Sequence, residues 1–434
     1  MPSKAKFALR ALQHRNFRLF FGGQSLSLVG TWMTSTATAW LVYRLTGSAI
    51  LLGLVSFAGL IPTFVLAPFA GVWVDRWNRH NLLITTQSLA MLQSFALAIL
   101  ALTHITMGEI IALSAFQGLI NSFDMPGRQA FLVEMVSGRE MLGNAIALNS
   151  TMVNFARLAG PAIAGIIIAL WGEGYCFLID GFSYVAVIAS LLAMHDLPGH
   201  ARAVRVAMLK SLREGWDYVA RFAPARMLLL LVALVSLMGM PYTVLMPIFA
   251  GSVLGGGAHT LGYLLSAAGA GALVAAARLA ARKSVRGLTR VVPISAALFG
   301  VGLLGVGLSR WLWLTLPMLF VAGLGMMQQM ASTNTILQTV VGEDKRGRVM
   351  AFYTMAFVGM APWGSLLAGT LAGHIGAPRT LMLDGVACLL GAGWFTLNLD
   401  TVRNAIRPIY QDLGIIPEAR AGVQAATLLT PPEG

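Results

Sequence analysis

Long apolar runs separated by short polar breaks dominate this sequence. A helix of about 20 residues crosses the roughly 30 Å hydrocarbon core of a bilayer. Only 11% of the residues are charged, whereas soluble domains carry about 25%. We therefore predict an all-α integral membrane protein with twelve transmembrane helices. The twelve runs are 16–43, 48–74, 81–103, 107–123, 142–170, 174–194, 226–253, 259–281, 288–308, 311–338, 347–373 and 378–399.

Positive charge is concentrated on one side of these predicted helices. Of the 30 Lys and Arg residues, 26 fall in segments that share one side, whereas Arg44, Arg310 and Arg379 lie on the other and Arg157 lies within a span. Cytoplasmic segments of membrane proteins carry such an excess. We therefore expect a multi-pass protein of the cell (inner) membrane with both termini in the cytoplasm. The net charge of +13 then needs no nucleic acid to explain it.

The two halves of the chain repeat one another. Asp180-Gly181 and Asp384-Gly385 occupy the same place in their halves, 204 residues apart. An internal duplication that produces two six-helix bundles is the simplest account. The predicted parts are an N-terminal bundle (1–194), a cytoplasmic linker with an amphipathic helix (195–225), a C-terminal bundle (226–400) and a flexible cytoplasmic tail (401–434).

A short charged loop joins the second and third runs. It has the pattern Gly-x-x-x-Asp-Arg-x-x-Arg, formed by Gly71, Asp75, Arg76 and Arg79. This pattern resembles the loop between helices two and three of major facilitator superfamily transporters, although Asn78 replaces the usual glycine. The resemblance implies that the glycine allows close helix packing, and that the aspartate faces the start of helix eleven. It also implies that the arginines join a charge cluster that closes the cytoplasmic side.

The fourth run ends near a second charged pair, Asp124 and Arg128. In the superfamily an acidic residue at this point joins the signature loop, which implies the same gate role for this pair. The alternative is an ordinary pair in a cytoplasmic loop. Pro126 and Gly127 argue against a regular helical turn here.

The fifth run combines small residues with an intramembrane charge. Gly160, Pro161 and Gly165 resemble, in part, the helix-five signature of superfamily antiporters, but Ala156 stands where another glycine is usual. A buried arginine costs about 2.5–3.5 kcal/mol on insertion scales, so Arg157 needs a partner. We expect Asp124 or an anionic substrate group. The alternative is that the side chain extends to the cytoplasmic surface.

Two acids lie within apolar runs, Asp180 and Asp384. Intramembrane acids are candidates for proton relays. Their matched positions also fit a second interpretation, in which each caps the start of a helix near the outer interface.

Polar residues within several runs are candidates for lining a substrate cavity, because polar groups in a span face protein or a water-filled path. The alternative is helix packing through small residues. The candidates are Gln24, Trp32, Thr36, Asn121, Asn149, Asn154, Arg157, Gln328, Gln329 and Asn334.

Three blocks, 30–48, 124–149 and 346–369, look like the branch of bacterial efflux permeases that includes the enterobactin exporter and macrolide efflux proteins. The resemblance implies proton-coupled export of a small organic molecule (a siderophore, drug or amphiphilic metabolite) by a monomer that alternates its access. A metabolite importer or uniporter, and a non-transporting scaffold or receptor, remain alternatives. No His/Cys/Asp cluster has metal or nucleophile spacing, so we expect neither an enzyme nor a bound cofactor or metal.

Overall fold

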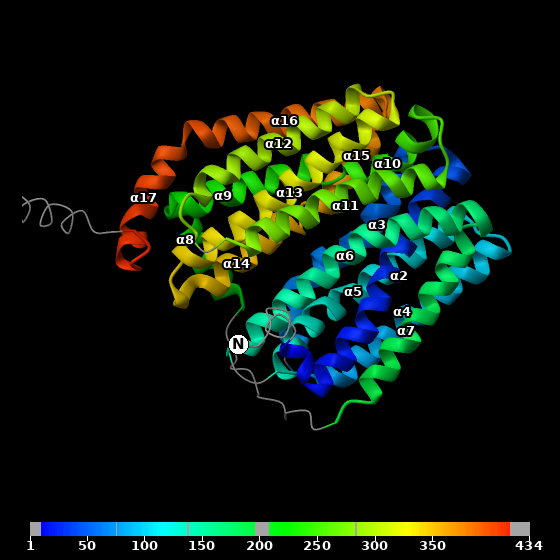
Figure 1. Ribbon diagram of the computed structural model, residues 1–434, viewed down its shortest axis with the longest axis horizontal. Helices are drawn as coiled ribbons and strands as arrows, with labels where there is room; N and C mark the ends of the chain where they lie inside the picture. Colours follow the sequence, from blue (N-terminus) through cyan, green and yellow to red (C-terminus); the bar gives the residue numbers. More distant parts are fainter. Residues whose placement is uncertain (1–9, 75, 137–138, 196–207, 283, 417–434) are drawn as a thin grey trace, which may run out of the picture.

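The computed structural model describes residues 10–416, except 75, 137–138, 196–207 and 283 (Figure 1). Within these residues the chain forms helices and no strands. The first bundle contains the short helix η1 (Arg10–Gln13), α2 (Arg15–Thr46), α3 (Ala49–Val74), α4 (Arg79–Leu102), α5 (Met107–Glu134), α6 (Arg139–Trp171) and α7 (Glu173–Leu192).

The second bundle repeats this plan with two divided spans. The seventh span of the chain, which is the first of this bundle, is interrupted by two π-helical turns, η2 and η3. The eleventh span of the chain is divided at residues 358–360. Its elements are α9 (Ala223–Leu234), η2 (Val235–Gly239), α10 (Tyr242–Ile248), η3 (Phe249–Val253), α11 (Ala258–Ala280), α12 (Leu288–Leu308), α13 (Leu312–Val340), α14 (Glu343–Phe357), α15 (Ala361–Ile375) and α16 (Ala377–Leu397).

Ten helical segments in the described chain are long and apolar enough to cross a membrane. The more polar helices α2 and α5, with 32 and 28 residues, complete the set. The predicted architecture of twelve transmembrane helices in two six-helix bundles is confirmed. Because the number of spans is even, η1 and α17 (Leu399–Asp412) lie on the same side of the molecule. We call this the linker side, and the opposite side the distal side.

Helix α8 (Met208–Arg221) lies within the segment that connects the bundles, as the amphipathic pattern predicts. It docks on α14, where Arg348 Nη1 lies 2.8 Å from Glu214 Oε2. The rings of Trp216 and Phe352 are 6.1 Å apart between their centroids. The linker helix is therefore fixed to the second bundle.

The expected flexible tail differs from the structure over residues 401–412. These residues belong to α17, whose Val402, Ile406 and Tyr410 are buried against the second bundle. Their four-residue spacing gives the helix one apolar face, which packs while the charged residues stay exposed. Residues 417–434 of the predicted tail lie outside the described part.

The bundles meet through closely spaced glycines. A Cβ atom added at Gly165 of α6 would lie 3.2 Å from the Cα of Gly262 on α11, and one added at Gly369 of α15 would lie 2.8 Å from the Cα of Gly53 on α3. Small residues let helix backbones approach this closely inside a membrane. The duplicated fold therefore makes two equivalent contacts between its halves.

Hydroxyl groups supplement these contacts in the distal half of the spans. Tyr43 Oη lies 2.8 Å from Ser252 Oγ, and Ser56 Oγ donates to Ser365 Oγ at 3.1 Å. With the two glycine pairs, these residues form what we call the distal seal. Figure 1 shows the bundles meeting where α3, α6 and α11 converge, and spreading apart toward α8 and α14.

A leucine at position 262 should disrupt the distal seal. Its side chain would meet Pro161 O and the Gly165 backbone, which cannot rotate away. Overpacking costs about 1–3 kcal/mol, so Gly262→Leu should lower the apparent melting temperature in detergent. Gly22→Leu is the matched control, because no atom lies within 4 Å of a Cβ at Gly22. Equal melting temperatures for the two variants would contradict the close packing of α6 on α11.

Candidate functional site

The linker-side ends of α4 and α5 form a buried charged network around Asp124, which is 3% exposed. Its Oδ1 accepts hydrogen bonds from Thr86 Oγ1 at 2.9 Å and Gln87 Nε2 at 2.7 Å, and its Oδ2 pairs with the Arg128 guanidinium. The predicted pair therefore forms. Pro126 does not interrupt α5, which continues to Glu134 rather than ending near residue 123. Packed neighbours allow a proline to persist within a membrane helix.

The signature loop contributes a separate ion pair. Arg79, the first residue of α4, places Nη1 2.5 Å from Oε1 of Glu134, the last residue of α5. Arg76 is exposed. Gly71 lies in α3, and Asp75 falls outside the described residues. Sequence reasoning missed Glu134 because the fourth span was expected to end eleven residues earlier.

Asp180 lies in a polar pocket between three helices of the first bundle. It is the eighth residue of α7 and 1% exposed. Its Oδ2 accepts hydrogen bonds from Thr34 Oγ1 of α2 and Ser94 Oγ of α4, both at 2.8 Å. The helix-cap alternative is wrong for this acid, because α7 begins at Glu173, two turns before it.

Asp384 occupies the equivalent position in α16 but has different surroundings. It is also the eighth residue of its helix and 2% exposed, so it caps no helix start. Its Oδ2 forms no hydrogen bond with any described residue. The duplication has therefore kept the carboxyl group and not its hydroxyl partners.

Arg157 lies near the middle of α6. It is the nineteenth of 33 residues, about 27 Å from the start of the helix, which is beyond the reach of its side chain. Its guanidinium carbon lies 5.2 Å from the centroid of the Trp32 ring on α2, and its buried Nε forms no hydrogen bond with a described residue. Asp124 pairs with Arg128 instead. Both the surface-reaching alternative and the Asp124 partner are therefore wrong.

The helix-five glycines pack against two different neighbours. A Cβ at Gly160 would lie 3.0 Å from Val29 O on α2, whereas Gly165 faces α11. Pro161 lies inside the continuous helix α6. This motif therefore allows α6 to pack closely on α2 of its own bundle and on α11 of the other bundle.

Several other cavity candidates bond within their own helices. Thr36 Oγ1 donates to Trp32 O, Asn154 Nδ2 to Ser150 O, Gln117 Nε2 to Asn121 Oδ1 and Gln338 Nε2 to Asn334 Oδ1. Asn149 and Gln328 are half-buried, whereas Gln24 and Gln329 are buried. Neither polar side-chain atom of Gln329 has a hydrogen-bond partner among the described residues.

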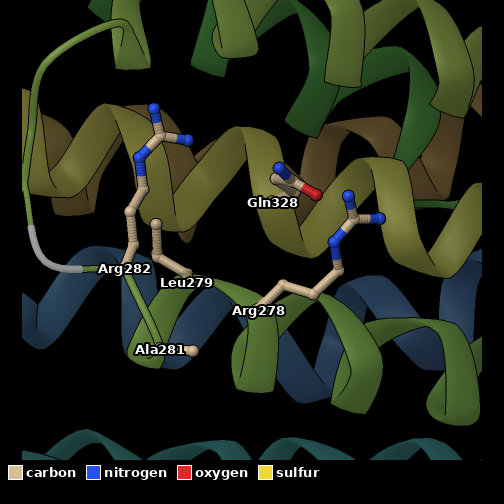
Figure 2. A pocket seen from close by; sticks show the side chains of 5 residues that line it. All are labelled: Arg278, Leu279, Ala281, Arg282 and Gln328. Atoms are coloured by element: carbon tan, nitrogen blue, oxygen red, sulfur yellow. The ribbon is translucent and has the colours of Figure 1, made fainter.

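A small cavity of about 230 Å³ lies between the linker-side end of α11 and Gln328, near the middle of α13. Figure 2 shows the side chains of Arg278 and Arg282 extending from the end of α11 to the level of Gln328 on α13. Sequence reasoning selected Gln328 and not the two arginines. Neither arginine forms an ion pair with a described residue. Their exposed charges make this end of the second bundle attractive to anions.

The two membrane acids should differ in their effects on stability. Asp180→Asn weakens charge-assisted hydrogen bonds worth about 1.5–3 kcal/mol each, so its apparent melting temperature should fall. Asp384→Asn removes an unpartnered carboxyl group and should leave the melting temperature unchanged or raise it. Thermal unfolding of both variants in one detergent measures the difference, and the opposite order would refute the assigned partners.

Two bundles of six membrane helices, each with a few buried polar side chains, are an architecture typical of membrane transporters. The chain matches the model of the transmembrane secretion effector family over residues 6–405. It therefore belongs to this family of the major facilitator superfamily, and the predicted resemblance to efflux permeases is confirmed. Transporters of this kind are not enzymes.

Three similar proteins are named as a transporter or as efflux proteins. The chain is 28% identical to the Staphyloferrin A transporter of Staphylococcus aureus, covering 86% of this chain and 93% of that one. It is 27% identical to the multidrug efflux pump Tap of Mycolicibacterium fortuitum, covering 83% and 90%. It is 21% identical to macrolide efflux protein A of Streptococcus pyogenes, covering 86% and 94%.

Solved structures agree on the fold. A bacterial homolog of the human lysosomal transporter Spinster superposes with a TM-score of 0.72 at 12% identity, covering 92% of this chain and 98% of that one. The nucleoside transporter NupG superposes with a TM-score of 0.68 at 12% identity, covering 89% and 99%.

Proposed function

We propose that this secondary transporter exports a small organic anion in exchange for protons. The observation that carries the proposal is the mid-membrane position of Arg157, which forms no ion pair with a described residue. The efflux named for two of the relatives, the pump Tap and macrolide efflux protein A, supports the direction of transport. We further propose that both termini are cytoplasmic, as the positive-inside distribution predicts, so the distal side faces outward.

The position of Arg157 inside the membrane has an energetic cost. An intramembrane arginine costs about 2.5–3.5 kcal/mol, and its contact with Trp32 returns about 0.5–2 kcal/mol. A substrate carboxylate would supply the missing counter-charge. Arg278 and Arg282 would raise the concentration of the anion at the linker-side end of the path.

Proton coupling would act through Asp180. Its Oδ2 bonds to Thr34, two residues from the Trp32 that contacts Arg157, so one helix carries both contacts. Protonation would remove an acceptor and change the position of α2. Movement of α2 would alter the contact between Arg157 and Trp32. The affinity of the cavity for an anion would change as a result.

We also propose that the charged residues at the linker-side ends of the first bundle act as a gate. The distal seal is closed here, and the ion pairs of Arg79, Asp124 and Arg128 stay within the first bundle. In the alternate state the linker-side ends would meet, and these charges with Asp75 would stabilise that closure. The protein would work as a monomer, because one chain supplies both bundles.

Proton release from the purified protein tests the coupling. Staphyloferrin A, a macrolide and simple organic anions would each be added to weakly buffered protein in detergent. We expect release with one anionic compound, reduced or absent in Asp180→Asn and retained in Asp384→Asn. Binding without release by the native protein would exclude antiport and favour a uniporter.

Replacement of Arg157 tests the substrate charge. Arg157→Gln should weaken binding of that anion roughly tenfold or more, because a hydrogen bond to a charged group is lost. Arg157→Lys should recover part of the affinity, since it keeps the charge without the planar guanidinium. Arg213→Gln, on the exposed surface of α8, is the matched control. Equal affinities for Arg157→Gln and the control would remove Arg157 from the site.

A further inference from the structure

A groove of about 610 Å³ lies on the linker side between the start of α12 and the C-terminal helix α17. It is remote in sequence from Asp124, Arg157 and Asp180, and it begins four residues after Arg282, whose Nη2 donates to Arg286 O at 2.8 Å. Its lining is strongly basic. It comes from residues 286–290 at the start of α12, from residues 400–410 of α17 and from Ile416. The lining residues are Arg286, Gly287, Thr289, Arg290, Asp400, Arg403, Asn404, Ile406, Arg407, Tyr410 and Ile416.

The charge of the groove is unbalanced. Four arginines face one carboxylate, and that carboxylate is already engaged, because Asp400 Oδ1 lies 3.7 Å from Arg403 Nη1. Arg286, Arg290 and Arg407 form no ion pair with a described residue. Like charges held together without a counter-ion repel one another, so the groove favours a bound anion.

The backbone adds to this preference. The first turn of α12 lines the groove, and its N-cap residue Gly287 offers no side-chain acceptor to the amide groups of that turn. The Leu288 amide donates to Val285 O and the Arg290 amide to Gly287 O, whereas the Thr289 amide has no such acceptor among the described residues. The start of a helix carries a partial positive charge and exposed N–H groups. An anion beside Gly287 and Thr289 would interact with both.

Tyr410 provides an independent indication of a missing ligand. The residue is 6% exposed, and its hydroxyl group is buried without a hydrogen-bond partner among the described residues. Burial raises the pKa of this hydroxyl, which therefore remains a donor. A buried donor without an acceptor costs about 1–3 kcal/mol. An anion oxygen in the groove would satisfy it.

We propose that this groove binds a phosphate group, with the arginine side chains, the first turn of α12 and the Tyr410 hydroxyl as its ligands. Arginine matches phosphate oxygens in charge and geometry. Because α17 follows directly from the membrane-spanning helix α16, the groove lies at the depth of lipid headgroups. The headgroup of an anionic phospholipid and a free phosphate share this chemistry.

Native mass spectrometry of the full chain in detergent distinguishes these sources. The probes are phosphatidylglycerol, zwitterionic phosphatidylcholine, glycerol phosphate and inorganic phosphate. We expect phosphatidylglycerol to bind more tightly than the other three. Comparable binding of inorganic phosphate would support the phosphate site and assign it to a soluble ligand. No preference for any anionic probe over phosphatidylcholine would overturn the proposal.

Substitutions locate the bound ligand. Arg290→Gln with Arg407→Gln should weaken phosphatidylglycerol binding roughly 30-fold, from about fivefold for each basic residue near an anionic surface. Arg213→Gln with Arg221→Gln removes the same charge from exposed positions on α8 and is the control. Equal affinities for the two double variants would overturn the site.

Tyr410→Phe separates ligand binding from folding. The hydroxyl has no partner among the described residues, so its removal should not lower the melting temperature without lipid. Affinity for phosphatidylglycerol should fall roughly tenfold, because the hydrogen bond to a charged oxygen is lost. An affinity equal to that of the native protein would contradict the role given to the hydroxyl.

Discussion

A polar group inside a bilayer has to find its partner within the protein, because the hydrocarbon offers none. The first bundle meets this requirement for two buried carboxylates by placing hydroxyl and amide groups around them. Asp124 has Thr86, Gln87 and Arg128, and Asp180 has hydroxyls from α2 and α4. Arg157 is the exception, held against Trp32 without an ion pair to a described residue. In our account this incomplete pairing is what a substrate completes.

The internal duplication explains why the two bundles have the same architecture. Divergence of the two halves explains why equivalent residues have different surroundings. Equivalent helix pairs, α3 with α15 and α6 with α11, bring the two bundles into backbone contact. The equivalent acids have not kept equivalent environments, since Asp384 lacks the hydroxyl partners of Asp180. In our proposal the two similar bundles would move against each other, and the buried groups Arg157 and Asp180 of the proposed site lie in the first half.

Much of this fold could be predicted from the sequence, because membrane thickness fixes helix length and apolar runs reveal it. The four-residue spacing of Asp124 and Arg128 allowed a pair on one helical turn, although Pro126 and Gly127 argued against a regular turn at that point. The role of Glu134 could not be predicted, because Pro126 suggested that the helix ends before this residue. Packing against neighbouring helices instead allows α5 to continue to Glu134. The four-residue spacing of Val402, Ile406 and Tyr410 indicates the amphipathic helix α17. A search for membrane-length apolar runs overlooks this pattern. The basic groove depends on segments more than one hundred residues apart, which no local pattern reveals.

In our proposal, proton binding shifts the protein between a distal-closed and a linker-closed state. Spin labels at Thr103 and Trp311 report the distal separation of the bundles, and labels at Asn81 and Gln338 report the linker side; all four residues are exposed. Pulsed electron resonance at pH 8 and pH 5.5 would give both distance distributions. We predict that acidification lengthens the first distance and shortens the second in the native protein, and changes neither in Asp180→Asn. Distances that are independent of pH, or that shift equally in both proteins, would contradict the account.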